Sequence, residues 1–191
     1  MAGHGHGGDH GGGNKGTALL IAILALFLAL AETGAKAAQT EALTRNIEAA
    51  NLWAFFQART IRQTTVRTAA EQTALDLAVA DEARRAAMTR QIEGWRESAT
   101  RWESEPATGE GRRELATRAR AAERVRDRSM AAYHHYEVGS AAFQVAIVLA
   151  SAAIVTSVPL LTILAGVLGA AGLVLTGIGF FAPEAVHLFG H

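Results

Sequence analysis

The sequence predicts an all-α membrane protein with one N-terminal transmembrane helix, a helical coiled-coil-like extramembrane domain and a C-terminal transmembrane helical hairpin. Two observations lead to this prediction. Charged residues are concentrated in the middle of the 191-residue chain, and a long uncharged apolar stretch lies on each side of it. The middle shows no alternation of apolar and polar residues at a period of two, the pattern expected of half-buried strands.

The first transmembrane helix is predicted at residues 16–35, with Glu32 close to its end. A helix that crosses a bilayer needs about 20 mostly apolar residues, and this segment supplies them. The alternative is a cleaved signal peptide, with Lys15 as its basic region and 35–37 (Ala-Lys-Ala) as its cleavage site. We interpret the segment as an uncleaved anchor, and both interpretations send the middle of the chain across the membrane.

The second apolar block contains no charge between Glu137 and Glu184, which is enough for two transmembrane helices. Pro159 lies in the middle of the block, where its fixed φ and missing N–H favour a turn. The alternative is one long span followed by a buried tail. The predicted segments are spans at 139–158 and 160–182 and a short tail at 183–191.

Residues 36–138 are predicted to form the helical extramembrane domain, because good helix formers dominate them. A cluster of Pro and Gly predicts a turn at 105–111. Both helices start at the membrane surface, and at 1.5 Å per residue the helix before the turn is far longer than the helix after it. We therefore expect a break in the longer helix. We predict that break at 60–68, where β-branched residues are dense. Alternating steps of four and three residues predict a heptad seam at Leu43, Ile47, Ala50, Ala54, Gln57 and Ile61.

The segment Ala50–Arg62 reads ANLWAFFQARTIR and resembles the signature A-x-x-W-A-F-x-Q-A-[RK]-x-x-R of an uncharacterised bacterial family of three-span membrane proteins. Residues 31–36 (AETGAK) and 143–148 (FQVAIV) also match this family, which is known only as a domain of unknown function. The resemblance extends over nearly the whole chain and implies no enzyme activity. It implies a bacterial inner-membrane protein with its N-terminus inside and its helical domain in the periplasm.

The distribution of basic residues bears on this orientation in two ways. Lys and Arg are more frequent in the middle of the chain than before the first span, which favours a cytoplasmic middle domain. That rule loses force for loops longer than about 60 residues, and this loop has about a hundred. Members of the family usually carry basic residues in the turn between the last two spans, whereas residues 156–161 here have none.

The signature supplies the first group of candidate site residues. Aromatic residues at helical spacing usually form a packing face, and an interfacial anchor or a ligand-binding face is the alternative. The predicted packing or interaction face consists of Trp53, Phe56, Gln57, Arg59 and Arg62.

Two polar residues are predicted within the membrane. Glu32 ends the first span and Gln144 begins the second, so both lie near the extramembrane domain and can meet. A carboxylate in lipid is costly unless it is paired or protonated. We interpret the pair as a structural hydrogen bond, and a proton-sensitive switch or a site for a lipid head group or cation is the alternative.

Small residues recur at every fourth position in the last two spans. Such spacing lets helices approach closely in lipid, so these residues are predicted to form helix-packing faces through which the chain self-associates. They are Ala142, Ala146 and Ala150, together with Ala165, Gly166, Gly169 and Ala170.

Residues 1–15 form a Gly/His-rich tail that cannot bury a core and is expected to be flexible. His4, His6 and His10 are candidate metal ligands. Removal of Met1 would leave Ala2-Gly3-His4, whose amine, amides and imidazole suit square-planar Cu(II) or Ni(II). A solvated linker without metal is the simpler interpretation.

The composition excludes several classes of function. The 18 basic residues balance the 18 acidic ones, which argues against nucleic acid as a partner, and the absence of Cys excludes thiol chemistry. No catalytic motif is present, so we expect no enzyme and no cofactor beyond the metal just described. The predicted function is a membrane-anchored structural or interaction protein that binds the lipid bilayer and itself, or an accessory subunit of a larger membrane complex. A proton- or metal-responsive sensor or transport accessory is the alternative.

Overall fold

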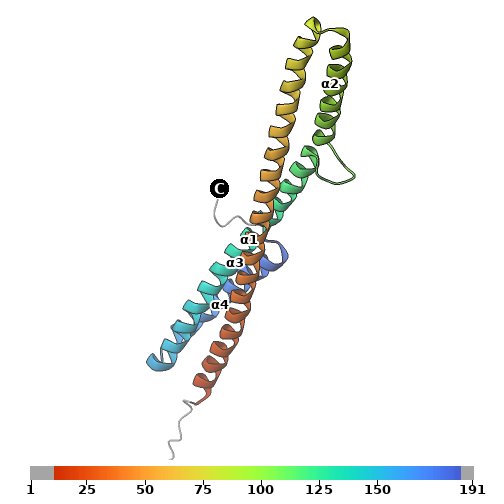
Figure 1. Ribbon diagram of the computed structural model, residues 1–191. Helices are drawn as coiled ribbons and strands as arrows, with labels where there is room; N and C mark the ends of the chain where they lie inside the picture. The colour runs from red at the N-terminus through yellow and green to blue at the C-terminus, as the bar shows by residue number, and fades with distance from the viewer. Residues whose placement is uncertain (1–10, 186–191) are drawn as a thin grey trace, which may run out of the picture. The chain divides into compact units, whose positions relative to one another are not determined.

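A computed structural model describes residues 11–185, with side chains from Lys15 onward, and this part of the chain is helical without any strand (Figure 1). Its elements are α1 (Gly11–Asp76), the short 3₁₀ helix η1 (Leu77–Val79), α2 (Glu82–Glu103), α3 (Arg112–Thr156) and α4 (Pro159–Phe181). Three of them, α1, α3 and α4, are long and apolar enough to cross a membrane. The predicted fold class is therefore confirmed.

The chain divides into two compact units. The first unit combines the described residues of Met1–Ala42 with those of Asp127–His191, and the second unit is Leu43–Arg126. Helices α1 and α3 contribute residues to both units, whereas α4 belongs to the first unit and α2 to the second.

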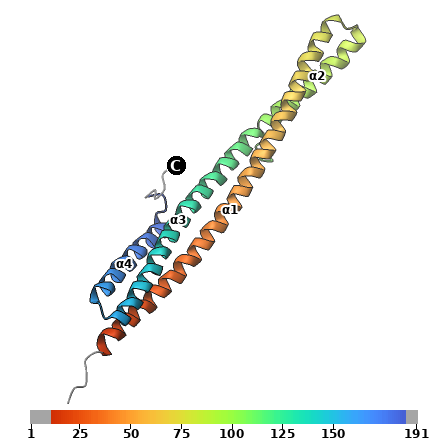
Figure 2. The same cartoon turned by 90° about the vertical axis from the view of Figure 1, so that its left-hand side faces the viewer.

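The core of the first unit is formed where α1, α3 and α4 lie side by side (Figure 2). Phe143 of α3 is 1% exposed and stacks on Phe27 of α1 with ring centroids 6.1 Å apart. Small residues let the backbones of neighbouring helices approach closely. Such close packing is what holds helices together in lipid, where the hydrophobic effect does not drive their association. The buried members of this core are Leu24, Ala31, Phe143, Ala146, Ala150 and Ala165.

Helices α3 and α4 cross at a pair of glycines. A Cβ added to Gly172 would lie 3.0 Å from the carbonyl oxygen of Gly139 and 3.0 Å from the ring of Phe143. A Cβ added to Gly139 would lie 3.1 Å from the carbonyl oxygen of Gly172. The two backbones therefore touch, which only glycine allows at these positions.

In the second unit, α2 folds back beside the last part of α1, and the turn between them corrects the predicted position of the break. The helix runs uninterrupted through 60–68 and ends at Asp76. The hydroxyl groups of Thr60, Thr64 and Thr65 donate to the carbonyl oxygens four residues earlier, at 2.9–3.0 Å. Threonine is compatible with a helix when it bonds the preceding turn in this way, so its weak intrinsic propensity did not decide the structure.

The actual break lies between Asp76 and Glu82. The side chain of Asp81 caps α2 by accepting a hydrogen bond from the backbone N–H of Arg84 at 2.9 Å. Glu82 in the first turn adds a negative charge where the helix dipole favours one. The N-terminal cap of α2 therefore marks the position of the break. The run of poor helix formers in α1 does not.

The buried seam of α1 in the second unit lies two positions further along the chain than the predicted heptad seam. The predicted residues Leu43, Ile47 and Ile61 are 60–67% exposed. The seam that packs within the chain again follows steps of three, four and seven residues, and many of its members are small or polar. It consists of Ala49, Leu52, Phe56, Arg59, Gln63 and Ala70.

Candidate functional site

The signature segment Ala50–Arg62 lies on α1 in the second unit and contacts α3 through its aromatic residues. The indole nitrogen of Trp53 donates to the Glu123 carboxylate at 2.8 Å. The ring of Trp53 meets Phe56 edge-on with centroids 5.4 Å apart. Both rings pack on a small core of Leu52, Leu115 and Ala119, so this face of the segment stabilises the pairing of α1 with α3.

Arg112, the first residue of α3, connects three helices. Its Nε donates to the hydroxyl of Thr60 at 2.9 Å, and its Nη1 donates to Gln63 at 2.7 Å and to the Glu103 carboxylate at 2.8 Å. Its guanidinium also lies over the ring of Phe56, 4.9 Å from the centroid. A planar cation with several donors suits this arrangement, which a lysine could not reproduce.

Gln63 completes this network from α1. It is 2% exposed, and its amide nitrogen donates to the carbonyl oxygen of Ala99 at 2.9 Å and to Glu103 at 3.1 Å. The hydrogen bond from Gln63, and the positive charges of Arg112 and Arg113, hold the pKa of Glu103 below its ordinary value, although desolvation opposes them. Glu103 therefore remains ionised as the acceptor of the network at neutral pH.

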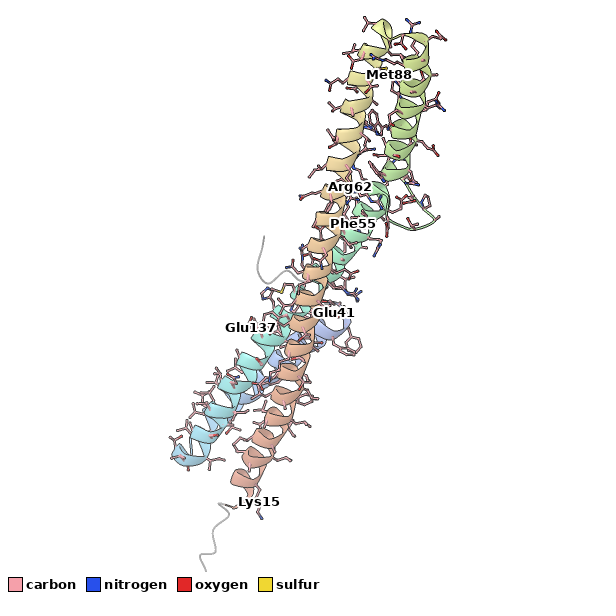
Figure 3. The ribbon with its side chains drawn as sticks, in the orientation of Figure 1. Lys15, Glu41, Phe55, Arg62, Met88 and Glu137 are labelled. Carbon is pink, nitrogen blue, oxygen red and sulfur yellow. The ribbon has the colours of Figure 1, made fainter. Side chains whose placement is uncertain are left out.

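Arg59 holds the loop between α2 and α3. Its Nη2 donates to the Glu110 carboxylate at 2.7 Å, and its guanidinium lies 5.2 Å from the ring centroid of Phe55. The side chain of Arg59 is 11% exposed, so this ion pair is better shielded from solvent than an ordinary surface pair. Figure 3 labels Phe55 on the same stretch of α1.

The loop itself is closed by Glu114 of α3. The carboxylate of Glu114 accepts from the hydroxyl of Ser104 at 2.6 Å and from the backbone N–H of Glu105 at 3.1 Å. These two hydrogen bonds hold the pKa of Glu114 below its ordinary value. A Cβ at Gly111 would collide with Glu114 and with the backbone of Glu105, and Gly109 has a φ of +68°, so the loop needs glycine at both positions.

The predicted face is only partly assembled by the structure. Trp53, Phe56 and Arg59 contact the rest of the second unit, whereas Gln57 and Arg62 are exposed. Sequence reasoning missed the residues that do most to connect the helices, Gln63, Glu103 and Arg112. Their partners lie up to 52 residues away in the chain. The one local signal for Arg112 was its position directly after the Pro/Gly cluster.

An apolar stripe on α1 remains outside the chain's own core. It keeps the heptad spacing of the predicted seam, and no residue of it is buried in the second unit. We name this surface the α1 stripe, and its members are Leu43, Ile47, Ala50, Ala54, Gln57 and Ile61.

The polar residues of the first unit meet as the sequence suggested. The amide nitrogen of Gln144 lies 3.5 Å from a carboxylate oxygen of Glu32, the long limit of a hydrogen bond. Both side chains are exposed on the surface of the unit rather than enclosed by it. A side chain near the end of a span can reach the head groups, so this geometry fits a contact at the edge of the membrane.

The small-residue faces pack within the chain. Ala146 and Ala150 are fully buried in the core of the first unit, and Ala165 and Gly169 are buried beside them. Ala146 therefore packs against the chain's own helices in this structure, and its predicted contact with a second copy stays a prediction. Ala142 and Gly166 are half-buried and Ala170 is exposed.

One comparison with known proteins identifies a family. The family described as a domain of unknown function, DUF4337, matches residues 13–182. The chain belongs to DUF4337. No curated protein and no solved structure matches it.

Membership in DUF4337 assigns no activity, ligand or partner to the chain, because the family is described only as a domain of unknown function. His4, His6 and His10 lie outside the described residues, and the structure does not test the Cu(II) or Ni(II) prediction. Within residues 15–185 no group of three or more His, Cys, Asp or Glu side chains could hold a metal ion.

Proposed function

We propose that this DUF4337 chain is a membrane-anchored interaction protein whose second unit associates with a second copy of itself. The observation that carries the proposal is the α1 stripe. Its three largest residues are 60–67% exposed in a unit that has already buried its own seam. Exposed apolar residues at heptad spacing are typical of a helix that packs against a partner helix.

The chemistry of the stripe suits an identical partner. Two copies anchored in one membrane point the same way, so a parallel pair places each stripe residue opposite itself. The flanking heptad positions carry no charge and therefore cause no repulsion between identical helices. These positions are Thr44, Asn46, Asn51, Trp53, Ala58 and Thr60.

Two features of the stripe favour a defined register. Ala50 and Ala54 are small and allow a close approach of two helices. Gln57 would face Gln57 of the second copy, and two amides can hydrogen bond to each other. A single polar residue in a coiled-coil seam fixes register at some cost in stability.

Replacing Ile47 with glutamate is expected to weaken association about tenfold, since it removes an apolar contact of about 1.5 kcal/mol and places like charges opposite each other. The measurement is the mass of the full chain in mild detergent as a function of concentration. Val125→Glu is the matched control, because Val125 is a 40% exposed apolar residue of α3 and not a member of the stripe.

A dimer that dissociates in Ile47→Glu but persists in Val125→Glu supports the proposal. A wild-type chain that is monomeric at all concentrations would overturn self-association. Stoichiometric foreign subunits on such a monomer would make the chain an accessory subunit of a larger membrane complex instead.

We further propose that the protein lies in a bacterial inner membrane with its second unit in the periplasm. The support is the length of the chain between the first two apolar blocks, about a hundred residues, because loops this long translocate largely regardless of their charge. The orientation also agrees with the family that the signature segment resembles.

Alkaline phosphatase fused after Gly109 is expected to be active in whole cells, because that enzyme folds only outside the cytoplasm. Gly109 suits the fusion, since it lies in the loop between α2 and α3 and is only half-buried. A cytoplasmic reporter fused at the same residue serves as the control. Activity of the cytoplasmic reporter together with a silent phosphatase would reverse the orientation.

A further inference from the structure

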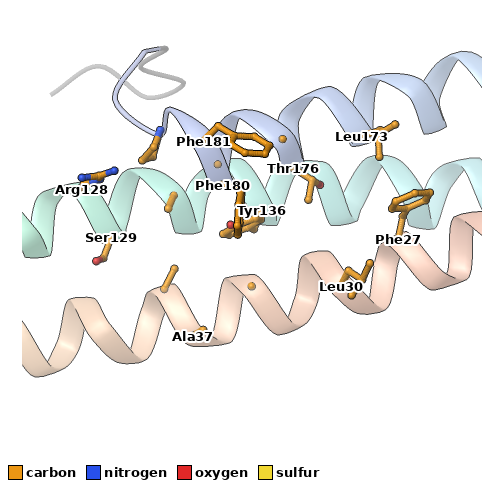
Figure 4. Close-up of a pocket in the computed structure, with 16 residues that line it drawn as sticks. Phe27, Leu30, Ala37, Arg128, Ser129, Tyr136, Leu173, Thr176, Phe180 and Phe181 are labelled. Carbon is orange, nitrogen blue, oxygen red and sulfur yellow. The ribbon is translucent and has the colours of Figure 1, made fainter.

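The first unit contains a groove of about 850 Å³ between α1, α3 and α4 (Figure 4). One end is apolar and is lined by Phe27, Leu30 and Leu173, which belong to the membrane-spanning parts of the chain. Arg128 and Ser129 lie at the other end, beyond the uncharged segment that begins after Glu137. The groove therefore passes from the apolar to the polar side of the membrane boundary.

The length of the groove matches one leaflet. On α1 it extends from Phe27 to Ala38, which corresponds to about 16 Å at 1.5 Å per residue. The hydrocarbon core of a bilayer is about 30 Å thick, so one leaflet contributes about half of that. An acyl chain that follows the groove would thus lie parallel to its neighbours in the bilayer.

A tyrosine with an unused hydroxyl lies in the middle of the groove. Tyr136 is 9% exposed, and its ring is held between Gly34 of α1 and Gly179 of α4, where an added Cβ would lie 3.1 Å and 3.4 Å from it. The hydroxyl of Tyr136 forms no hydrogen bond with any described residue. The ring is buried but the hydroxyl is accessible from the groove, so a ligand there can accept its hydrogen bond.

Arg128 provides the groove with a positive charge. It is the one charged residue among the described residues that line the groove, and it forms no ion pair within the described chain. Basic side chains at the edge of a membrane attract anionic lipids, each with about 1 kcal/mol.

We propose that the groove binds one anionic phospholipid of the surrounding bilayer. Its acyl chain lies along Phe27, Leu30 and Leu173, its glycerol ester region accepts a hydrogen bond from Tyr136, and its phosphate lies at Arg128. The order of apolar, hydrogen-bonding and cationic groups along the groove is the order of the matching groups in a phospholipid.

Glycines on α4 provide a matched pair of variants for the test. Gly177 lines the groove, and a Cβ added there meets no atom within 4 Å, so Gly177→Leu fills the groove without a collision. Gly166 also has no atom within 4 Å of an added Cβ but does not line the groove. Gly166→Leu is therefore the control for the effect of a larger residue on α4.

The experiment is native mass spectrometry of the full chain in mild detergent, titrated with dioleoyl phosphatidylglycerol or dioleoyl phosphatidylcholine. Wild type is expected to bind one phosphatidylglycerol with a Kd about fivefold lower than that for phosphatidylcholine. Gly177→Leu should lose this binding, whereas Gly166→Leu should keep it. Arg128→Gln should bind both lipids equally, and Arg124→Gln, a change at an exposed arginine one turn away, should keep the preference.

Two results would overturn the proposal. One is equal binding of the two lipids by wild type, which would leave no role for Arg128. The other is unchanged binding in Gly177→Leu, which would place the lipid outside the groove. Tyr136→Phe, which removes only the hydroxyl, should weaken binding of both lipids to a similar degree, and an unchanged Kd would contradict the assigned hydrogen bond.

Discussion

Replacing Arg112 with alanine is expected to lower the free energy of unfolding by about 2–4 kcal/mol, the largest effect predicted for a single residue of this chain. The variant leaves Glu103 and Gln63 without their principal partner and removes the cation from the face of Phe56. Breaking one side of a fully buried ion pair costs about 3–5 kcal/mol. The expected value is lower, because the side chains of Arg112 and Glu103 are 23% and 32% exposed.

The neighbouring arginine provides the control for this experiment. Arg113 bonds the same carboxylate of Glu103 at 3.3 Å, but its side chain is 73% exposed. Exposed ion pairs contribute about 0–1 kcal/mol, so Arg113→Ala should leave the free energy of unfolding nearly unchanged. Denaturant unfolding of the full chain in detergent, followed by circular dichroism, measures both variants. Equal effects of the two changes would show that Arg112 acts only as a surface charge.

Replacing Gly172 with leucine is expected to destabilise the first unit by about 2–3 kcal/mol, the upper part of the range for overpacking. The new Cβ would meet the carbonyl oxygen of Gly139, and a backbone oxygen cannot move aside without separating α3 from α4. The change should therefore disturb the helix crossing itself rather than one side chain.

The measurement for Gly172→Leu is unfolding in a mixture of mild detergent and dodecyl sulfate. Gly166→Leu adds the same side chain to the same helix at a position with open space around it and should behave like wild type. If both variants unfold at the same denaturant concentration as wild type, the backbones of α3 and α4 do not touch in the folded protein.

The helical class and the three candidate spans could be predicted from the sequence, because uncharged runs of about 20 residues have few alternatives to a membrane helix. The end of α1 could not be predicted from helix propensity. Residues 77–81 read LAVAD and contain neither Gly nor Pro, so the sole local signal was the cap formed by Asp81 before Glu82. The threonines that suggested a break instead bond the preceding turn of the helix.

The seam of the second unit lies two positions further along the chain than predicted, because the prediction took apolar character as the sign of burial. In this unit the buried positions include Arg59 and Gln63, while Leu43 and Ile61 stay exposed. A polar residue is tolerated inside when its hydrogen bonds are satisfied, and these partners come from α2 and from the loop that precedes α3. The sequence pattern of one helix carries no information about partners so distant in the chain.

The connection between α3 and α4 consists of Ser157 and Val158, and Ser157 has a φ of +54°. If α3 and α4 both cross the bilayer, so short a connection makes them an antiparallel pair and returns Glu137 and Glu184 to the same side of the membrane. Lys and Arg that flank a span set its orientation, and the sequence between these glutamates contains neither. The orientation of the hairpin therefore follows from the segments that precede it in the chain.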